Sequence, residues 1–220
     1  MKLQNKAEKL SEKVFLGGPV QWFETIGRLQ LITLLSEGLY PESKILDIGC
    51  GCLRGGYWLI HFLNSDCYFG IEPNQEMLEA GISNLLEPDL LKQKQPRFDN
   101  NTKFDSSVFN EKFDFFLARS IWTHSSKDNI LTMLKAFLRD SKKNGIFLTS
   151  VYKKRFFSKR SDYKGNKWVG RSHECNKAGQ VYHSLSWVKK QCEKRGLAAE
   201  EIKDKGYNYG NQIWLKIIRK

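Results

Sequence analysis

The chain has 220 residues, of which 40% are hydrophobic, and a formal net charge of +12 at pH 7. This length suits one well-filled α/β domain and excludes two full domains joined by linkers. No stretch approaches the roughly 20 apolar residues of a membrane-spanning helix, and residues 1–6 lack the apolar core of a signal peptide, so we expect a cytoplasmic protein.

The N-terminal 40 residues are expected to form a helical cover. Trp22, Phe23, Ile26, Leu29 and Ile32 recur at helical spacing, which predicts a helix whose apolar stripe packs on the core.

Residues 44–56, KILDIGCGCLRGG, predict a buried strand over 45–48, a glycine turn and the start of a helix that continues over 57–63. Gly49 and Gly51 allow a sharp turn and a close approach of the backbone to a ligand. A second apolar strand over 67–72 ends in Glu72, from which a carboxylate can hydrogen-bond both hydroxyls of a ribose. The sequence therefore predicts a nucleotide-binding loop.

The residue before this turn indicates the kind of nucleotide. Asp47 would repel a pyrophosphate but suits a ligand with a cationic amino group. The spacing also differs from the G-x-G-x-x-G of dinucleotide-binding loops. Cys50 and Cys52 in the loop have no second pair at zinc spacing, so we expect packing residues and no metal, with a metal site as the alternative. Five scattered cysteines argue against a disulfide framework.

Asp47-x-Gly49-x-Gly51, followed by Glu72 at the end of the next strand, resembles the class I S-adenosylmethionine-dependent methyltransferases. The resemblance runs from about Lys44 to Lys220. It implies a Rossmann-like, doubly wound, seven-stranded and mostly parallel α/β sheet, with S-adenosyl-L-methionine as the cofactor. It departs from the family pattern where the third glycine of the loop falls at Leu53.

The later elements alternate as the resemblance requires. Strands are expected near 96–99 and over 113–118, 144–150 and 212–218, with helices over 127–140 and from the N-cap Ser184 to Arg195, before Gly196. Asn100, after the third strand, is expected to meet the adenine, with Asp99, Asn101 and Asp105 as rivals. Arg28 or Arg54 is expected to pair with the cofactor's carboxylate, and a surface ion pair is the alternative for each.

Methyl transfer to oxygen gains from a general base, and His is the usual choice near neutral pH. His124 follows the fourth strand and is the catalytic candidate, with a packing or capping role as the alternative. His173 and His183 are further candidates, each alternatively a surface residue, and His61 is expected to be structural.

Residues 153–171 carry eight Lys and Arg residues against Asp162 alone, interleaved with Phe156, Phe157, Tyr163 and Trp168. This pattern suits an anionic or ring-bearing substrate, including a phosphorylated sugar or RNA. A solvated, mobile loop is the alternative.

We therefore expect a single methyltransferase domain with a cover (1–40), a cofactor-binding core (41–150), a basic substrate-facing insertion (151–183) and a C-terminal helix and strands (184–220). The expected substrate is a small molecule, sugar-containing or anionic, methylated at oxygen. Residues 118–121 read ARSI, where many nucleic-acid amino-group methylating enzymes carry an Asn/Asp-Pro-Pro-Tyr tetrapeptide. RNA methylation and a non-catalytic cofactor-binding role remain as alternatives, and the sequence does not indicate the oligomeric state.

Overall fold

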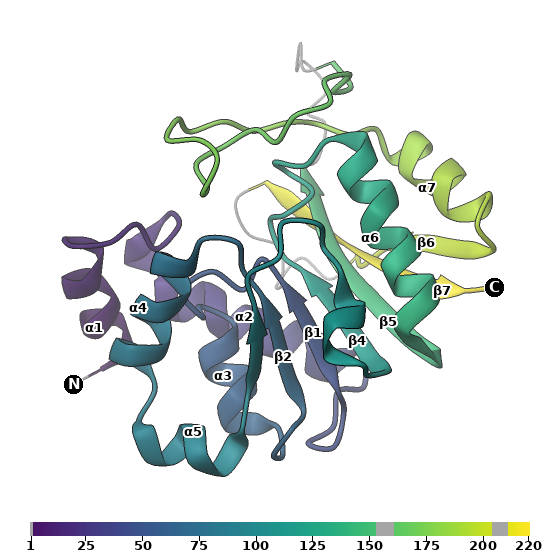
Figure 1. Cartoon of the computed structure of the whole chain (residues 1–220). Coiled ribbons are helices and arrows are strands. Elements are labelled where there is room, and N and C mark those ends of the chain that lie inside the picture. The colour runs from purple at the N-terminus through teal and green to yellow at the C-terminus, as the bar shows by residue number, and fades with distance from the viewer. Residues whose placement is uncertain (1, 153–160, 204–210) are drawn as a thin grey trace. The chain divides into compact units, whose positions relative to one another are not determined.

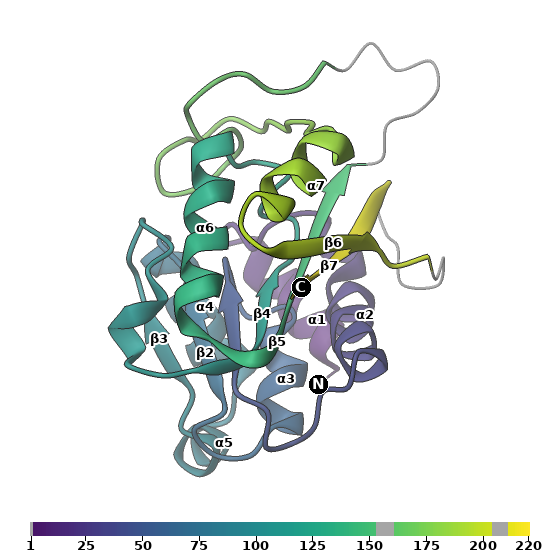
Figure 2. The ribbon, with the colours of Figure 1, turned by 90° about the vertical axis from the view of Figure 1, so that its right-hand side faces the viewer.

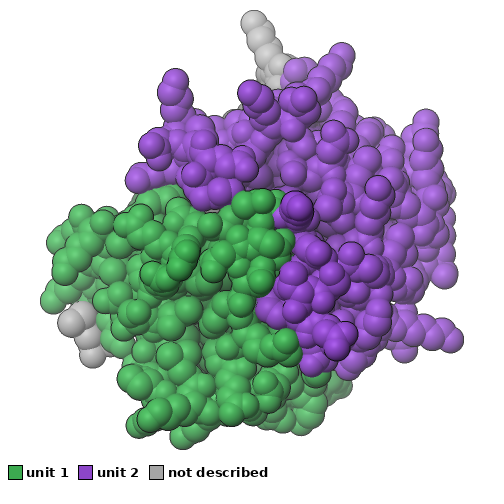
Figure 3. Space-filling model, viewed as in Figure 1, with its two compact units in different colours: residues 1–102 green, residues 103–220 purple. Residues whose placement is uncertain are grey.

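The computed structural model describes residues 2–152, 161–203 and 211–220 (Figure 1). The chain divides into two compact units, residues 1–102 and 103–220 (Figure 3). Its strands follow the order β3-β2-β1-β4-β5-β7-β6 in a seven-stranded, mostly parallel sheet, which confirms the expected fold class.

The first unit contains three parallel strands and the N-terminal helices. In chain order its elements are α1 (Leu3–Ser11), the 3₁₀ helix η1 (Val20–Trp22), α2 (Phe23–Ser36), β1 (Ile45–Ile48), α3 (Gly56–Phe62), β2 (Tyr68–Ile71), α4 (Gln75–Leu85), α5 (Pro88–Lys94) and β3 (Arg97–Asp99). Strands β1 and β2 are buried along their whole length, as their short and largely apolar sequences predict. Their parallel register brings the carboxyl ends of β1, β2 and β3 to one edge.

The described residues of the second unit form four strands, two helices and a 3₁₀ helix. Its elements are η2 (Ser106–Phe109), β4 (Phe113–Ala118), α6 (Lys127–Asp140), β5 (Ser141–Tyr152), α7 (Leu185–Glu193), β6 (Leu197–Glu201) and β7 (Gln212–Arg219). Strands β4 and β5 are parallel, whereas β7 runs antiparallel between β5 and β6. Helix α7 packs on β6 (Figure 2). Ser184 caps it by accepting from the Trp187 N–H, and Gly196 follows in a left-handed conformation, as expected.

The N-terminal cover is part of the core of the first unit. Buried residues of α1 and α2 pack with Cys52 of the loop after β1 and with Met77 of α4. Within the cover α1 contacts α2, and the cover packs on the rest of the unit through α1 against α4 and through α2 against α3, the helix that follows the loop. Among the described residues, no helix combines the length and the apolar character needed to cross a bilayer.

The predicted apolar stripe of α2 is partly wrong. Phe23 and Ile26 are buried, but Trp22 is 46% exposed and Ile32 is 41% exposed. The buried face passes instead through Gly27, where an added Cβ would lie 2.2 Å from the backbone oxygen of Arg54. Because the side of the helix that carries Gly27 packs against the Arg54 backbone, Trp22 and Ile32 face solvent.

Candidate functional site

The loop after β1 turns through three left-handed residues. Gly49, Gly51 and Leu53 have φ angles of 72°, 56° and 64°. The Gly49 N–H donates to the carbonyl of Ile71 at 2.8 Å, which ties the loop to the end of β2. A side chain at Gly51 would start 3.3 Å from the sulfur of Met77, so the loop has little room there.

Glu72, the first residue after β2, connects this loop to the next helix. Its carboxylate accepts from the Gly51 N–H at 2.9 Å and from the Asn74 N–H at 2.8 Å. Asn74 in turn caps α4 by accepting from the Met77 N–H. The side chain of Asn100 donates to the backbone oxygen of Glu72 at 2.7 Å. The structure thus brings together Gly51, Glu72 and Asn100 at the carboxyl ends of parallel strands, where open α/β sheets bind ligands.

The residues considered as alternatives to Asn100 for contacting the adenine form other interactions. Asp99 accepts from both the backbone and the side-chain N–H groups of Asn101, which shapes the turn after β3 and leaves Asn100 exposed. Asp105 lies in the second unit, where it caps η2 and pairs with Arg139 at 2.7 Å.

Asp47 is a buried carboxyl with one protein donor. It is 4% exposed and accepts from the Tyr68 hydroxyl at 2.8 Å. Burial raises the pKa of Asp47 to about 7, the Tyr68 hydrogen bond opposes this shift, and the charge of Glu72 adds to it. A cation placed at this carboxyl would compensate the buried charge.

The two arginines have different environments. The Arg54 guanidinium donates to the carbonyls of Gly17 and Gly18 at 3.1 Å each and lies over the ring of Phe23. It therefore fastens the N-terminal cover to the loop. Arg28 is exposed, 3.9 Å from Glu24 and above the ring of Trp58.

The loop cysteines pack in the interior. Burial raises the pKa of both thiols, that of Cys52 to about 12, and Cys52 donates to the carbonyl of Leu16. These thiols are neutral at physiological pH. Among the described residues, no group of three or more His, Cys, Asp or Glu side chains is arranged to hold a metal ion.

His124 lies in the second unit, in the turn between β4 and α6. Its Nδ1 is 2.9 Å from the carbonyl oxygen of Val169 and 2.8 Å from that of Gly179. Because both partners only accept, Nδ1 must carry the proton, which leaves Nε2 as a lone pair in the neutral ring. Burial lowers the pKa of His124, and the two carbonyl hydrogen bonds oppose part of that shift. A neutral imidazole with a defined tautomer is suited to accept a proton.

The described part of the insertion folds onto the segment that holds His124. The Val181 N–H donates to Thr123, the Val169 N–H donates to His124, and His183 bonds the carbonyl of Ser125. These hydrogen bonds tie residues 161–183 to that segment, whereas the charged side chains of Lys164, Lys167 and Arg171 are exposed. Residues 153–160, with five of the eight basic side chains, Phe156 and Phe157, lie outside the described residues.

The burial of one of the other three histidines differs from what the sequence indicated. His183 is 1% exposed, so its alternative interpretation as a surface residue is wrong. His173 is exposed beside Glu174 at 3.3 Å. His61 is exposed on α3, and its Nδ1 lies 2.7 Å from the carbonyl oxygen of Tyr57.

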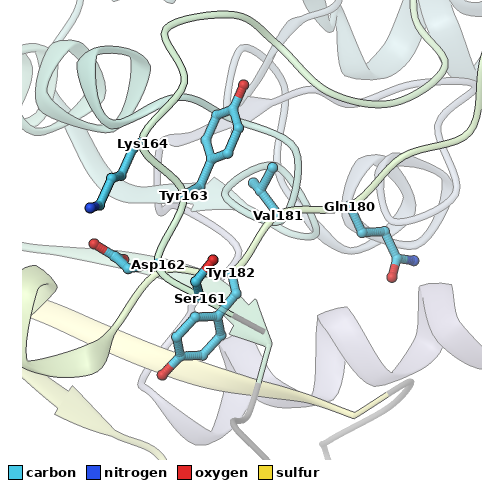
Figure 4. A pocket seen from close by; sticks show the side chains of 7 residues that line it. All are labelled: Ser161, Asp162, Tyr163, Lys164, Gln180, Val181 and Tyr182. Atoms are coloured by element: carbon cyan, nitrogen blue, oxygen red, sulfur yellow. The ribbon is translucent and has the colours of Figure 1, made fainter. Parts of the chain in front are cut away.

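An open hollow of about 550 Å³ lies between the two stretches 161–164 and 180–182 (Figure 4). The Tyr163 N–H joins them by donating to Tyr182, and the two tyrosine rings point to opposite sides. Asp162 pairs with Lys127 and accepts from the Ser184 N–H at 3.0 Å. These bonds fasten the insertion to the starts of α6 and α7.

Sequence reasoning missed a polar cluster beyond the ends of β4 and β5. It consists of Arg119, Ser120, Ser150 and Gln212, whose side chains meet at the Gln212 carbonyl oxygen. The available signal was a glutamine directly before three apolar residues at the start of the last strand.

Comparison with known proteins identifies the family. A sequence model described as a methyltransferase domain matches residues 23–202. The chain belongs to the methyltransferase-domain family. The match confirms the resemblance based on Asp47, Gly49, Gly51 and Glu72. No curated protein matched the sequence.

Solved methyltransferases share the fold at low sequence identity. An S-adenosylmethionine-dependent methyltransferase from Clostridium acetobutylicum ATCC 824 has a TM-score of 0.65 and 13% identity, covering 99% of each chain. Magnesium protoporphyrin IX methyltransferase from Synechocystis PCC 6803, with bound SAM, has a TM-score of 0.62 and 13% identity, covering 100% of this chain and 98% of that one. The glycopeptide N-methyltransferase MtfA, complexed with S-adenosyl-L-methionine, has a TM-score of 0.64 and 8% identity, covering 89% of this chain and 94% of that one.

Proposed function

We propose that this methyltransferase uses S-adenosyl-L-methionine (SAM) to methylate an oxygen atom of a small molecule. The observation that carries the proposal is the Glu72 carboxylate, which accepts from the loop at Gly51 and from the start of α4 at Asn74. A carboxylate held at this edge of the sheet is oriented to accept the two ribose hydroxyls as well. The cofactor-bound structures of the magnesium protoporphyrin and glycopeptide methyltransferases support this choice of cofactor.

The other cofactor contacts follow from the same loop. Asp47, buried and lacking a positively charged partner among the described residues, would pair with the cationic amino group. Gly49 and Gly51 would admit the cofactor close to the backbone, and exposed Asn100 would meet the adenine. Of the two arginines proposed for the cofactor's carboxylate, we favour Arg28, since Arg54 already donates to two backbone carbonyls.

For the chemical step, we assign His124 as the general base. Bound SAM supplies an activated methyl group and a neutral thioether leaving group. His124 Nε2 would take the proton that the substrate hydroxyl loses on methylation, while the thioether would leave with the electron pair of its bond to the methyl group. The carbonyls of Val169 and Gly179 hold the ring and stabilise the imidazolium that results.

A small-molecule substrate is favoured over RNA by the aromatic residues of the insertion. The Tyr163 hydroxyl donates to the carbonyl of Lys167, and the ring of Trp168 lies 5.7 Å from that of His124. Sequence-tolerant binding of single strands needs open aromatic faces on which bases stack. The Trp168 ring lies against His124, outside the insertion, and is therefore not an open stacking face. The cytoplasmic location stays a prediction.

Calorimetry of SAM binding to Glu72→Gln tests the cofactor site, with Glu76→Gln as the matched control on the exposed face of α4. The variant replaces one acceptor oxygen by an amide donor. We therefore expect the affinity to fall by the equivalent of one charge-assisted hydrogen bond, roughly 1.5–3 kcal/mol. The control should bind as the unmodified protein does, and an unchanged affinity of Glu72→Gln would refute the assignment.

Methyl-labelled SAM, incubated separately with a pool of small metabolites and with total RNA, tests the substrate class. Labelling of a metabolite supports the proposal. Labelling of RNA that declines steeply with salt would replace it with the RNA alternative. SAM binding without turnover in either pool would favour a non-catalytic role.

A further inference from the structure

The polar cluster beyond the ends of β4 and β5 converges on one oxygen. Gln212 Oε1 accepts from Arg119 Nη1 at 2.7 Å, from the Ser150 hydroxyl at 2.7 Å and from the Ser120 hydroxyl at 3.1 Å. The Ser150 oxygen also accepts from the Ser120 N–H at 2.9 Å. These bonds use the acceptor capacity of the Gln212 carbonyl.

The same bonds fix the orientation of the Gln212 amide. The Arg119 guanidinium can only donate, so it excludes the flipped amide, in which the NH₂ group would face it; the serine hydroxyls fit either orientation. Gln212 is 9% exposed, and within the described part of the chain its Nε2 makes no hydrogen bond. An amide NH₂ without a protein acceptor is left to bind water or a ligand.

The position of the cluster matches a ligand site. Ser120 follows the carboxyl end of β4 by two residues, and Gln212 pairs with Tyr152, the last residue of β5. Ligands of open α/β sheets bind beyond these strand ends. The Arg119 guanidinium lies 4.7 Å from the ring centre of buried Trp214, which holds a positive charge beside the amide.

We propose that the Gln212 amide NH₂, beside the Arg119 charge, binds a carboxylate of the methyl-accepting substrate. A substrate group that approaches the Gln212 NH₂ must accept a hydrogen bond from it. The neighbouring positive charge of Arg119 favours an anionic acceptor over a neutral carbonyl. This inference rests on the proposed function and narrows its substrate to small hydroxy acids.

The test uses the full chain saturated with S-adenosylhomocysteine, the demethylated cofactor. Saturation-transfer NMR compares a library of small aromatic and aliphatic hydroxy acids with the carboxamide of each member. The key variant is Gln212→Glu, which keeps an acceptor oxygen for the three donors but replaces the NH₂ group with a negative charge. The matched control, Gln93→Glu, makes the same change at an exposed residue of α5.

We expect carboxylates to bind the unmodified protein and Gln93→Glu, with Gln212→Glu weakening them on the order of tenfold or more. The Gln212 side-chain NH₂ resonance, identified by its loss in Gln212→Glu, should shift when a carboxylate binds. This second measurement needs only the unmodified protein, so a poorly folded variant does not decide the outcome.

Three results would overturn the proposal: no carboxylate binds, the carboxamides bind equally well, or the NH₂ resonance stays unchanged while carboxylates bind. Calorimetry of SAM on the same samples separates these results from failure of the proposed function. Intact SAM binding with no carboxylate preference removes only the Gln212 subsite, whereas loss of SAM binding in the unmodified protein removes the cofactor assignment.

Discussion

Replacing Asp47 by Asn should stabilise the protein and weaken cofactor binding at the same time. The substitution keeps the shape of the side chain and an oxygen that accepts from the Tyr68 hydroxyl. It removes a negative charge that is 4% exposed. Two effects of opposite sign follow, one on the free protein and one on the complex.

The stability effect follows from the raised pKa. Burial raises the Asp47 pKa from 3.8 to about 7, so between these values the folded state holds a proton that the unfolded state has lost. Stability must then fall as pH rises through this window and level off above it. At about 1.4 kcal/mol per pKa unit, the cost at pH 8 reaches about 4 kcal/mol as an upper bound. Asp47→Asn avoids this cost.

Urea unfolding of both proteins at pH 4, 6 and 8 measures the difference. The two free energies of unfolding should be similar at pH 4 and diverge as pH rises, with the variant more stable. Asp66→Asn, at an exposed left-handed residue of the same unit, controls for the loss of a surface charge. If Asp47→Asn is no more stable than the unmodified protein at pH 8, the buried charge does not have the cost inferred here.

Calorimetry measures the opposite effect on SAM. The loss of a charged partner for the amino group should weaken binding by roughly tenfold to a hundredfold. Affinity of the unmodified protein should also fall as pH drops below 7, because Asp47 must ionise to form the pair. Unchanged SAM affinity in Asp47→Asn would refute the placement of the amino group at this carboxyl.

Three further predictions concern catalysis and the packing of the loop. His124→Gln should lower kcat by roughly 10²–10⁴-fold with SAM affinity unchanged. Because the pKa of His124 is lowered, the pH–rate profile of the unmodified enzyme should rise at a pH below the usual 6.5 of an imidazole, and the variant should lack this rise. Gly170→Ala places a Cβ 2.5 Å from His124 Nδ1 at a residue with φ of 121°, so steady-state kinetics should show a reduced kcat without loss of SAM binding. Gly27→Ala places a Cβ 2.2 Å from the Arg54 backbone oxygen, and urea unfolding should show a destabilisation of about 1–3 kcal/mol.

Short apolar runs bounded by glycines predicted the strands well. The first strand was expected over 45–48 and is found there, because three apolar residues in four buried positions before a glycine turn fit a short buried strand. The fifth was expected over 144–150 but extends over Ser141–Tyr152, since pairing with β4 and β7 continues strand geometry into residues with no apolar pattern. The face of α2 was misjudged because helical periodicity does not show that a glycine contacts a neighbouring backbone.

The proximity of Gly51, Glu72 and Asn100 was predictable because parallel strands bring their carboxyl ends to one edge. The cluster at Gln212 was not, because its serine partners lie 62 and 92 positions away along the chain. Its strand also runs antiparallel to β5, so its start, and not its end, reaches this edge. The spacing of residues along the sequence does not indicate that side chains so far apart will form hydrogen bonds with one another.

The loop after β1 also shows how a leucine can occupy a position at which the family motif has a glycine. Leu53 stands where the third glycine is expected, and it adopts the left-handed conformation with φ of 64°. That conformation costs a leucine about 1–2 kcal/mol. The side chain is fully buried, and this burial contributes about 1.5–3 kcal/mol of stabilisation, which offsets the conformational cost. It packs beneath the first turn of α3, where a Cβ on Gly56 would be 2.9 Å from Leu53 Cδ2. Interior packing thus replaces glycine's conformational freedom at this position, and the shape of the loop depends on the core under it.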